Sequence, residues 1–176
     1  MLGAAGALCC VAAGTAVGSW LRERRAMRYR LIRAETEALS RMRVLLEQER
    51  PALPELLRRS ADNVSCADGV KEVAMRLRLA AETLEREPLS GVEGAYACAC
   101  RMVGAPQEGA EEKEAMTMLF RQLGIGTAGM REQAVAACLR RLKPLEEQTR
   151  GQMEKGGKLC MQLGMLLGLM AGIILW

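Results

Sequence analysis

Both ends of this 176-residue chain lack charge, and this pattern constrains its fold more than any other feature. Residues 1–21 contain no Asp, Glu, Lys or Arg, and the same holds for residues 159–176. A helix that crosses a bilayer needs about 20 largely apolar residues, so each end is predicted to be a transmembrane helix. The predicted organisation is a span over 1–21, a helical domain over 22–157 and a second span over 158–176.

Basic side chains follow the first predicted span and precede the second one. Because such residues tend to stay on the cytoplasmic side of a membrane, the middle domain is predicted to be cytoplasmic. A signal peptide would carry its positive charges before the apolar run, so the first segment is interpreted as a retained anchor. The arginines could also bind anionic lipid, although topology alone accounts for them. The flanking residues are Arg22, Arg24, Arg25, Arg28, Arg30, Lys155 and Lys158.

Small residues recur at four-residue spacing within both predicted spans. Such a row lets two membrane helices approach closely, so these positions are predicted to form helix–helix contacts. The alternative is that glycine is simply tolerated there, and the partner helix could belong to the same chain, a second copy or another protein. The predicted contact residues are Gly6, Gly14, Gly18, Gly164, Gly168 and Gly172.

The middle of the chain is rich in helix-forming residues and lacks the alternating β-branched pattern of strands. Apolar residues at i, i+3, i+4 and i+7 predict helices over about 20–50, 54–62, 70–86, 90–103 and 109–123, and a sixth after residue 129. The predicted fold is all-α: an antiparallel six-helix bundle whose first and last helices extend into the spans. Pro51 and Pro54 are predicted to fix the first corner.

Local signals refine this expectation. Ser90 and Glu93 fit a capping box at the start of the fourth helix. Pro144 is predicted to kink the sixth helix, and Gly151, Gly156 and Gly157 are predicted to weaken it before the second span. The glycines of residues 124–129 (GIGTAG) match the dinucleotide-binding pattern G-x-G-x-x-G, but that pattern needs a preceding strand. A turn between two helices, with Thr127 as the cap of the next one, is predicted instead.

Composition argues against several classes of function. The net charge is only +4 and aromatic residues are scarce, which disfavours nucleic-acid binding. The chain has no histidine, the commonest general base and a frequent metal ligand. Cys98 and Cys100 stand two apart on a predicted helix, so their side chains point in different directions. No catalytic residue, metal ligand or cofactor site is predicted.

The chain resembles the stage III sporulation protein AB family of endospore-forming bacteria over nearly its whole length. The resemblance is carried by residues 45–57 (LLEQERPALPELL), by Leu123-Gly124 followed by Glu132-Gln133, and by two segments near the end. These segments are residues 155–160 (KGGKLC) and 163–169 (LGMLLGL), which are similar to the family's closing motif.

The resemblance implies a non-enzymatic scaffold in the mother-cell membrane that faces the forespore, within a channel or secretion-like complex. It also implies partners among the other stage III sporulation proteins, including a cytoplasmic ATPase, and a domain similar to that of the type II secretion F platform protein. Self-association is a further possibility. Two rival classes are a membrane-tethered adaptor that recruits a soluble partner outside any secretion machine, and a thiol-based enzyme, which the absence of an activating base disfavours.

Overall fold

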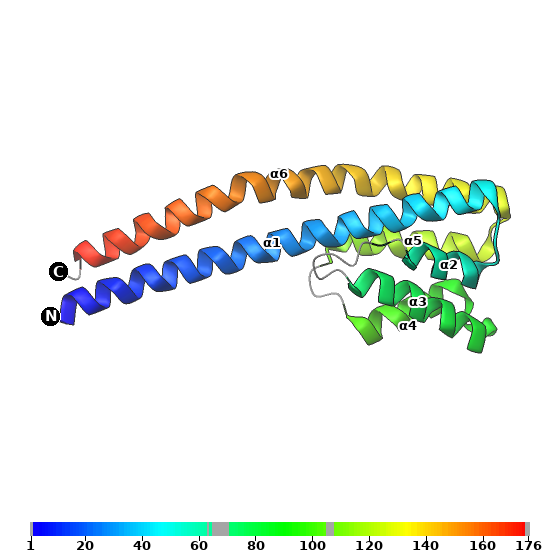
Figure 1. The fold of residues 1–176 in the computed structure, drawn as a ribbon, viewed down its shortest axis with the longest axis horizontal. Coiled ribbons are helices and arrows are strands. Elements are labelled where there is room, and N and C mark those ends of the chain that lie inside the picture. Colours follow the sequence, from blue (N-terminus) through cyan, green and yellow to red (C-terminus); the bar gives the residue numbers. More distant parts are fainter. Residues whose placement is uncertain (1, 63, 65–70, 105–107, 175–176) are drawn as a thin grey trace. The chain divides into compact units, whose positions relative to one another are not determined.

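The chain is entirely helical in the part that the structure describes. The computed structural model describes residues 2–62, 64, 71–104 and 108–174, without the side chains of 2–12, 14, 154–169 and 171–174. These residues contain six α-helices, a short 3-10 helix and no strand, which confirms the predicted class (Figure 1). The helices are α1 (Leu2–Gln48), α2 (Leu53–Asp62), α3 (Lys71–Arg86), η1 (Pro88–Ser90), α4 (Gly91–Val103), α5 (Ala110–Ile125) and α6 (Ala128–Ile174).

The chain divides into two units, and the two longest helices contribute to both of them. One unit comprises Met1–Tyr29 and Glu147–Trp176, and the other comprises Arg30–Glu146. Within the described residues, no helix combines the length and the apolar character that crossing a membrane requires. The predicted spans over 1–21 and 158–176 are therefore not confirmed, and most of their side chains lie outside the described residues.

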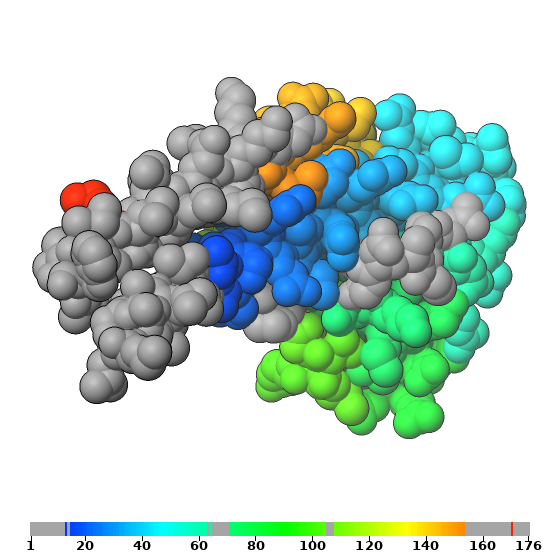
Figure 2. Space-filling view, turned by 60° about the vertical axis from the view of Figure 1, so that its left-hand side comes forward, coloured from blue at the N-terminus to red at the C-terminus, as the bar shows by residue number. Residues whose placement is uncertain are grey.

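The unit Arg30–Glu146 is built around one hydrophobic core to which all six α-helices contribute. On the face seen in Figure 2, the part of α1 in this unit (light blue to cyan) lies between α6 (yellow) and the layer of α3 and α4 (green). Burying one such Leu or Phe side chain contributes roughly 1.5–3 kcal/mol. The predicted apolar faces are buried in each helix, as shown by Leu31, Ala38, Leu45, Leu56, Ala61, Val73, Leu77, Val92, Tyr96, Met116, Phe120, Val135 and Leu142.

The first corner forms where α1 ends and two prolines follow. The backbone N–H groups of Glu49 and Arg50 both donate to Leu45 O at 3.0 Å, and Arg50 adopts a left-handed φ of 49°. This backbone conformation reverses the chain at the end of a helix, although glycine is the usual residue there. Pro51 lies in the connection and Pro54 in the first turn of α2, where its missing N–H would have no helical partner.

The predicted capping box of α4 is wrong. Ser90 has helical backbone angles (φ −68°, ψ −16°) and makes no side-chain cap bond, and its hydroxyl donates to Glu87 O at 2.7 Å. The physical reason is the 3-10 turn that begins at Pro88, because a capping residue needs an extended backbone. Glu93 instead accepts from Arg121 of α5 at 2.8 Å and 3.0 Å.

The last helix continues without interruption through the residues predicted to disturb it. Pro144 lies inside α6, and Gly151 is a helical residue of the same element. Within the glycine-rich segment 124–129, residues 126–127 form the predicted turn between α5 and α6, and a helix rather than a strand precedes it. A Cβ atom at Gly126 would lie 3.0 Å from Gln122 O and 3.1 Å from Met130 Cβ, so the close approach of the two helix ends requires glycine.

Candidate functional site

The core of the bundle contains charged side chains from three helical regions. Arg76 of α3 and Glu35 of α1 are each 1% exposed, and Glu112 of α5 is fully buried. Arg76 Nη1 lies 3.7 Å from Glu35 Oε1 and 3.4 Å from Oε2 of Glu108, which precedes α5. A single guanidinium therefore connects α1 with the segment that leads into α5. We call these four residues the buried charge cluster.

The buried charge cluster has more carboxyl groups than cations, and several of its polar atoms are unpaired. Neither carboxyl oxygen of Glu35 has a hydrogen-bond partner, and the same is true of Nε and Nη2 of Arg76. Burial raises the pKa of Glu35 to about 8, with the charge of Glu108 adding to this effect and Arg76 opposing it. Burial also raises the pKa of Glu108. Glu35 is therefore mostly protonated at neutral pH.

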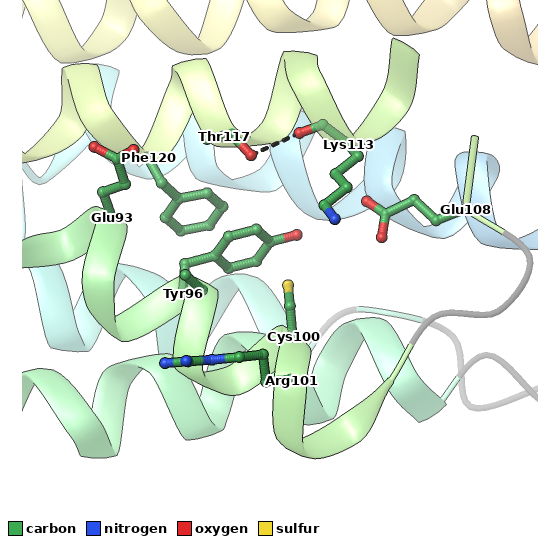
Figure 3. Close-up of a pocket in the computed structure, with 9 residues that line it drawn as sticks. Glu93, Tyr96, Cys100, Arg101, Glu108, Lys113, Thr117 and Phe120 are labelled. Atoms are coloured by element: carbon green, nitrogen blue, oxygen red, sulfur yellow. Dashed lines mark hydrogen bonds between the residues drawn. The ribbon is translucent and has the colours of Figure 1, made fainter. Parts of the chain in front are cut away.

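A pocket between α4 and α5 borders this cluster at Glu108. Its cavity volume is about 590 Å³, within the range of small-molecule sites. Its floor includes the rings of Tyr96 and Phe120, which stack with centroids 3.7 Å apart and planes within 6°. Figure 3 shows the Tyr96 hydroxyl and the side-chain ends of Lys113 and Glu108 pointing toward one another. The remaining lining residues are Glu93, Ala97, Cys100, Arg101 and Thr117.

The chemistry of this pocket favours binding over covalent catalysis. Burial raises the pKa of the Cys100 thiol, which leaves it protonated and poorly nucleophilic at neutral pH. The Thr117 hydroxyl donates to Lys113 O at 2.8 Å, so its proton is already engaged (Figure 3). In the described part of the chain, no group of three or more acidic or cysteine side chains is arranged to hold a metal ion.

The glycines predicted from the sequence to pack membrane helices belong to the two long helices. On α1 lie Gly6, Gly14 and Gly18, and on α6 lie Gly164, Gly168 and Gly172. Gly18 is half-buried, and the surroundings of the other five glycines lie outside the described residues. Their packing role stays a prediction.

The predicted basic flanks also lie on α1 and α6. Arg22, Arg24, Arg25 and Arg30 are exposed on α1, Arg28 is half-buried, and Lys155 and Lys158 lie on α6 with side chains outside the described residues. The Arg24 guanidinium stands 5.5 Å from the centroid of the Trp20 ring, within cation–π range.

Sequence reasoning missed the buried charge cluster, although a signal for it was present. Glu35 follows Ile32 by three residues and precedes Leu39 by four, so it stands in the apolar stripe of α1. Arg76 stands in the same way between Val73 and Ala80. A charged residue within an apolar stripe predicts a buried charge, because residues three and four apart share one helix face.

Comparison with known families identifies the chain. The sequence model of the family described as Stage III sporulation protein AB (spore_III_AB) matches residues 3–176. Comparisons with curated proteins and with solved structures found no match. The family match includes both uncharged ends, the helical bundle and the pocket between α4 and α5. The chain therefore belongs to the stage III sporulation protein AB family.

Proposed function

We propose that this protein is a non-enzymatic scaffold of a sporulation complex and that both of its ends are anchored in a membrane. The observation that carries the proposal is the family match over residues 3–176, which includes both uncharged ends. α1 and α6 are each 47 residues long, or about 70 Å at 1.5 Å per residue. Each helix joins one uncharged end to the bundle without a break. A continuous helix couples movement of the end segment to the bundle, which suits a structural protein rather than an enzyme.

The charge pattern supports the direction of anchoring. Basic residues stand beside both uncharged ends and none stands within them, which favours a bundle on the cytoplasmic side of the membrane. The resemblance to the family supports a position in the membrane facing the forespore, within a channel or secretion-like complex. It also supports assembly with other stage III sporulation proteins, including a cytoplasmic ATPase.

The bundle interior is consistent with a structural role. The chain has no histidine, and the thiol at the pocket is held protonated by burial. The buried charge cluster connects α1 with α3 and with the start of α5, so it fixes a long helix against the bundle core. A buried polar network of this kind is typical of a protein whose helices must keep one fixed arrangement.

A flexible insertion tests the proposed coupling. Inserting Gly-Gly-Ser-Gly after Tyr29, where the two units meet in α1, should interrupt the helix and abolish spore formation in cells that lack the native protein. A seven-residue Ala-rich insertion at the same point keeps a continuous helix over two turns and serves as the matched control. Normal spore formation with the flexible insertion would contradict the scaffold role.

Co-purification separates the proposal from its rival. A scaffold of the complex should recover other stage III sporulation proteins from detergent extracts of sporulating cells. An adaptor outside that complex should recover a soluble partner without them, and this result would overturn the assignment to a secretion-like assembly.

A further inference from the structure

A second groove lies at the end of the bundle where α2 and α4 begin. Its cavity volume is about 430 Å³, and most of its lining is apolar. Leu53 and Pro54 from the start of α2, Gly91 and Val92 from the start of α4, and Leu84, Pro88, Gly124 and Arg131 line it. Arg131, in the first turn of α6, is the only charged side chain among them. We call this surface the end groove.

Exposed apolar residues stand next in the sequence to residues that line the end groove. Leu89 and Ile125 are 103% and 83% exposed, which makes them the most exposed large apolar side chains of the described residues. Leu89 follows the lining residue Pro88, Ile125 follows Gly124, and Met130, 59% exposed, precedes Arg131. Exposed apolar residues next to the residues of an apolar groove are typical of an interaction surface.

The electrostatics of the end groove favour a negatively charged group. Arg131 Nε is buried from solvent and has no hydrogen-bond partner. No acidic side chain lines the groove, and Glu93, in the first turn of α4, is engaged by Arg121 of α5.

We propose that the end groove binds a partner protein of the sporulation complex through a segment that presents an apolar side chain beside an Asp or Glu carboxylate. The apolar side chain lies against Leu53, Leu84 and Val92, and the carboxylate accepts a hydrogen bond from Arg131. This inference rests on the proposed function, because it names the chemistry of one partner of that scaffold.

The groove fits such a segment better than it fits lipid or a second copy of the chain. A lipid surface is recognised by clusters of basic residues, and this groove contains one. A two-fold pair of copies would place the same patch on both sides of the interface, and that patch contains Arg131 but no acidic lining residue to pair with it. A segment with an acidic and an apolar side chain can bind both the Arg131 guanidinium and the apolar lining of the groove.

Site-specific crosslinking tests the proposal in sporulating cells that express the full chain. A photoreactive amino acid at position 125 should crosslink to another protein of the complex, and mass spectrometry should find Asp or Glu beside an apolar residue in the crosslinked peptide. The matched control carries the same group at Met102, which is 69% exposed on α4 and lies outside the end groove. The control position should not crosslink to that peptide.

Two further variants locate the contact. Arg131→Glu should lower the crosslinking yield roughly tenfold or more, because it replaces an attraction with a repulsion. Gly124→Leu should lower it by filling the groove, and a Cβ there meets Val92 at an ordinary 3.5 Å, so the fold is retained. Thermal unfolding confirms that both variants are folded. Crosslinking that persists in both variants, or that links to lipid or to a second copy, would overturn the proposal.

The outcomes also separate this inference from the proposed function. One outcome is that the groove variants leave crosslinking yield and spore formation normal while the flexible insertion after Tyr29 abolishes spore formation. In that case the groove proposal is wrong and the scaffold role stands. If the crosslinked acidic segment belongs to a protein outside the stage III sporulation proteins, the groove chemistry stands and the proposed complex is wrong.

Discussion

The core of the bundle holds two regions of different chemistry. Around Leu56 and Leu57 of α2 the core is apolar, and both side chains are fully buried. Around Arg76 it is charged, with a guanidinium shared between Glu35 and Glu108. Apolar packing tolerates many side chains of similar volume, whereas a buried ion pair is stable only in one geometry. The charged region lowers stability and fixes the position of α1.

The largest expected effect comes from removing the only cation of the buried charge cluster. Arg76→Met leaves the surrounding carboxyl groups without their cation and should lower the free energy of unfolding by about 3–5 kcal/mol. Urea denaturation measures this loss. The matched control is Arg78→Met on the same helix, whose partner Asp62 is 2.9 Å away and whose side chain is 55% exposed. A loss equal to that of the control would remove the distinction between the two regions.

Truncating a side chain of the apolar region should lower the free energy of unfolding somewhat less than Arg76→Met does. Leu57→Ala removes buried methyl groups and leaves a cavity, which should lower the free energy of unfolding by about 2–5 kcal/mol. Leu57→Met conserves volume and should cost less than about 1.5 kcal/mol. Both are measured by urea denaturation. A large loss with methionine would mean that the apolar region is as geometry-specific as the charged one.

Replacing Glu35 with glutamine should raise the free energy of unfolding, whereas the two preceding substitutions should lower it. Its pKa is about 8 in the folded chain against 4.5 for an ordinary glutamate, so folding favours the protonated form. Its contribution to stability is complete below about pH 4.5 and is lost as the pH rises toward 8. Glu35→Gln should therefore stabilise the protein by roughly 2–3 kcal/mol at pH 7.

The pH dependence provides the check on Glu35. Unfolding measured from pH 5 to pH 8 should give a stability that falls with pH in the native chain and falls much less in Glu35→Gln. Glu37→Gln, on the exposed side of α1, serves as the control and should follow the native chain. If Glu35→Gln is destabilising at pH 7, the carboxylate is charged and makes a net favourable pair with Arg76.

The smallest effect is expected at the bundle surface. Arg121→Met breaks a hydrogen-bonded pair with Glu93 at 2.8 Å, but the two side chains are 59% and 41% exposed. Exposed pairs contribute about 0–1 kcal/mol, so the unfolding midpoint should hardly move. A loss comparable to that of Arg76→Met would mean that the shorter distance, rather than burial, determines the strength of these pairs.

Helix type and apolar faces could be predicted because they follow from local periodicity. The stripe that contains Ile32 and Leu39 identifies the buried face of α1 without knowledge of its neighbours. Local periodicity could not predict whether the capping box at Ser90 forms. Its hydrogen bonds depend on the 3-10 turn at Pro88 and on Arg121 of another helix. Local patterns do not determine competition between partners far apart in the sequence.

The convergence of distant residues in the pocket, the end groove and the buried charge cluster could not be predicted for the same reason. The meeting of Glu35, Arg76 and Glu108 requires three segments to converge, and no spacing along the chain encodes that convergence. The end groove likewise combines residues of α2, α3, α4, α5 and α6 with Pro88 of η1. The turn at Gly126 was predictable as a turn, but the contact of the neighbouring Gly124 with Val92 of α4 was not.

Washing membranes from sporulating cells with alkaline carbonate tests the central claim, membrane anchoring of a helical scaffold, most directly. The full chain should remain in the membrane pellet and leave it only when detergent is added, as expected for a protein held by apolar helices. Complete release into the carbonate supernatant, with the bundle still folded, would contradict the account.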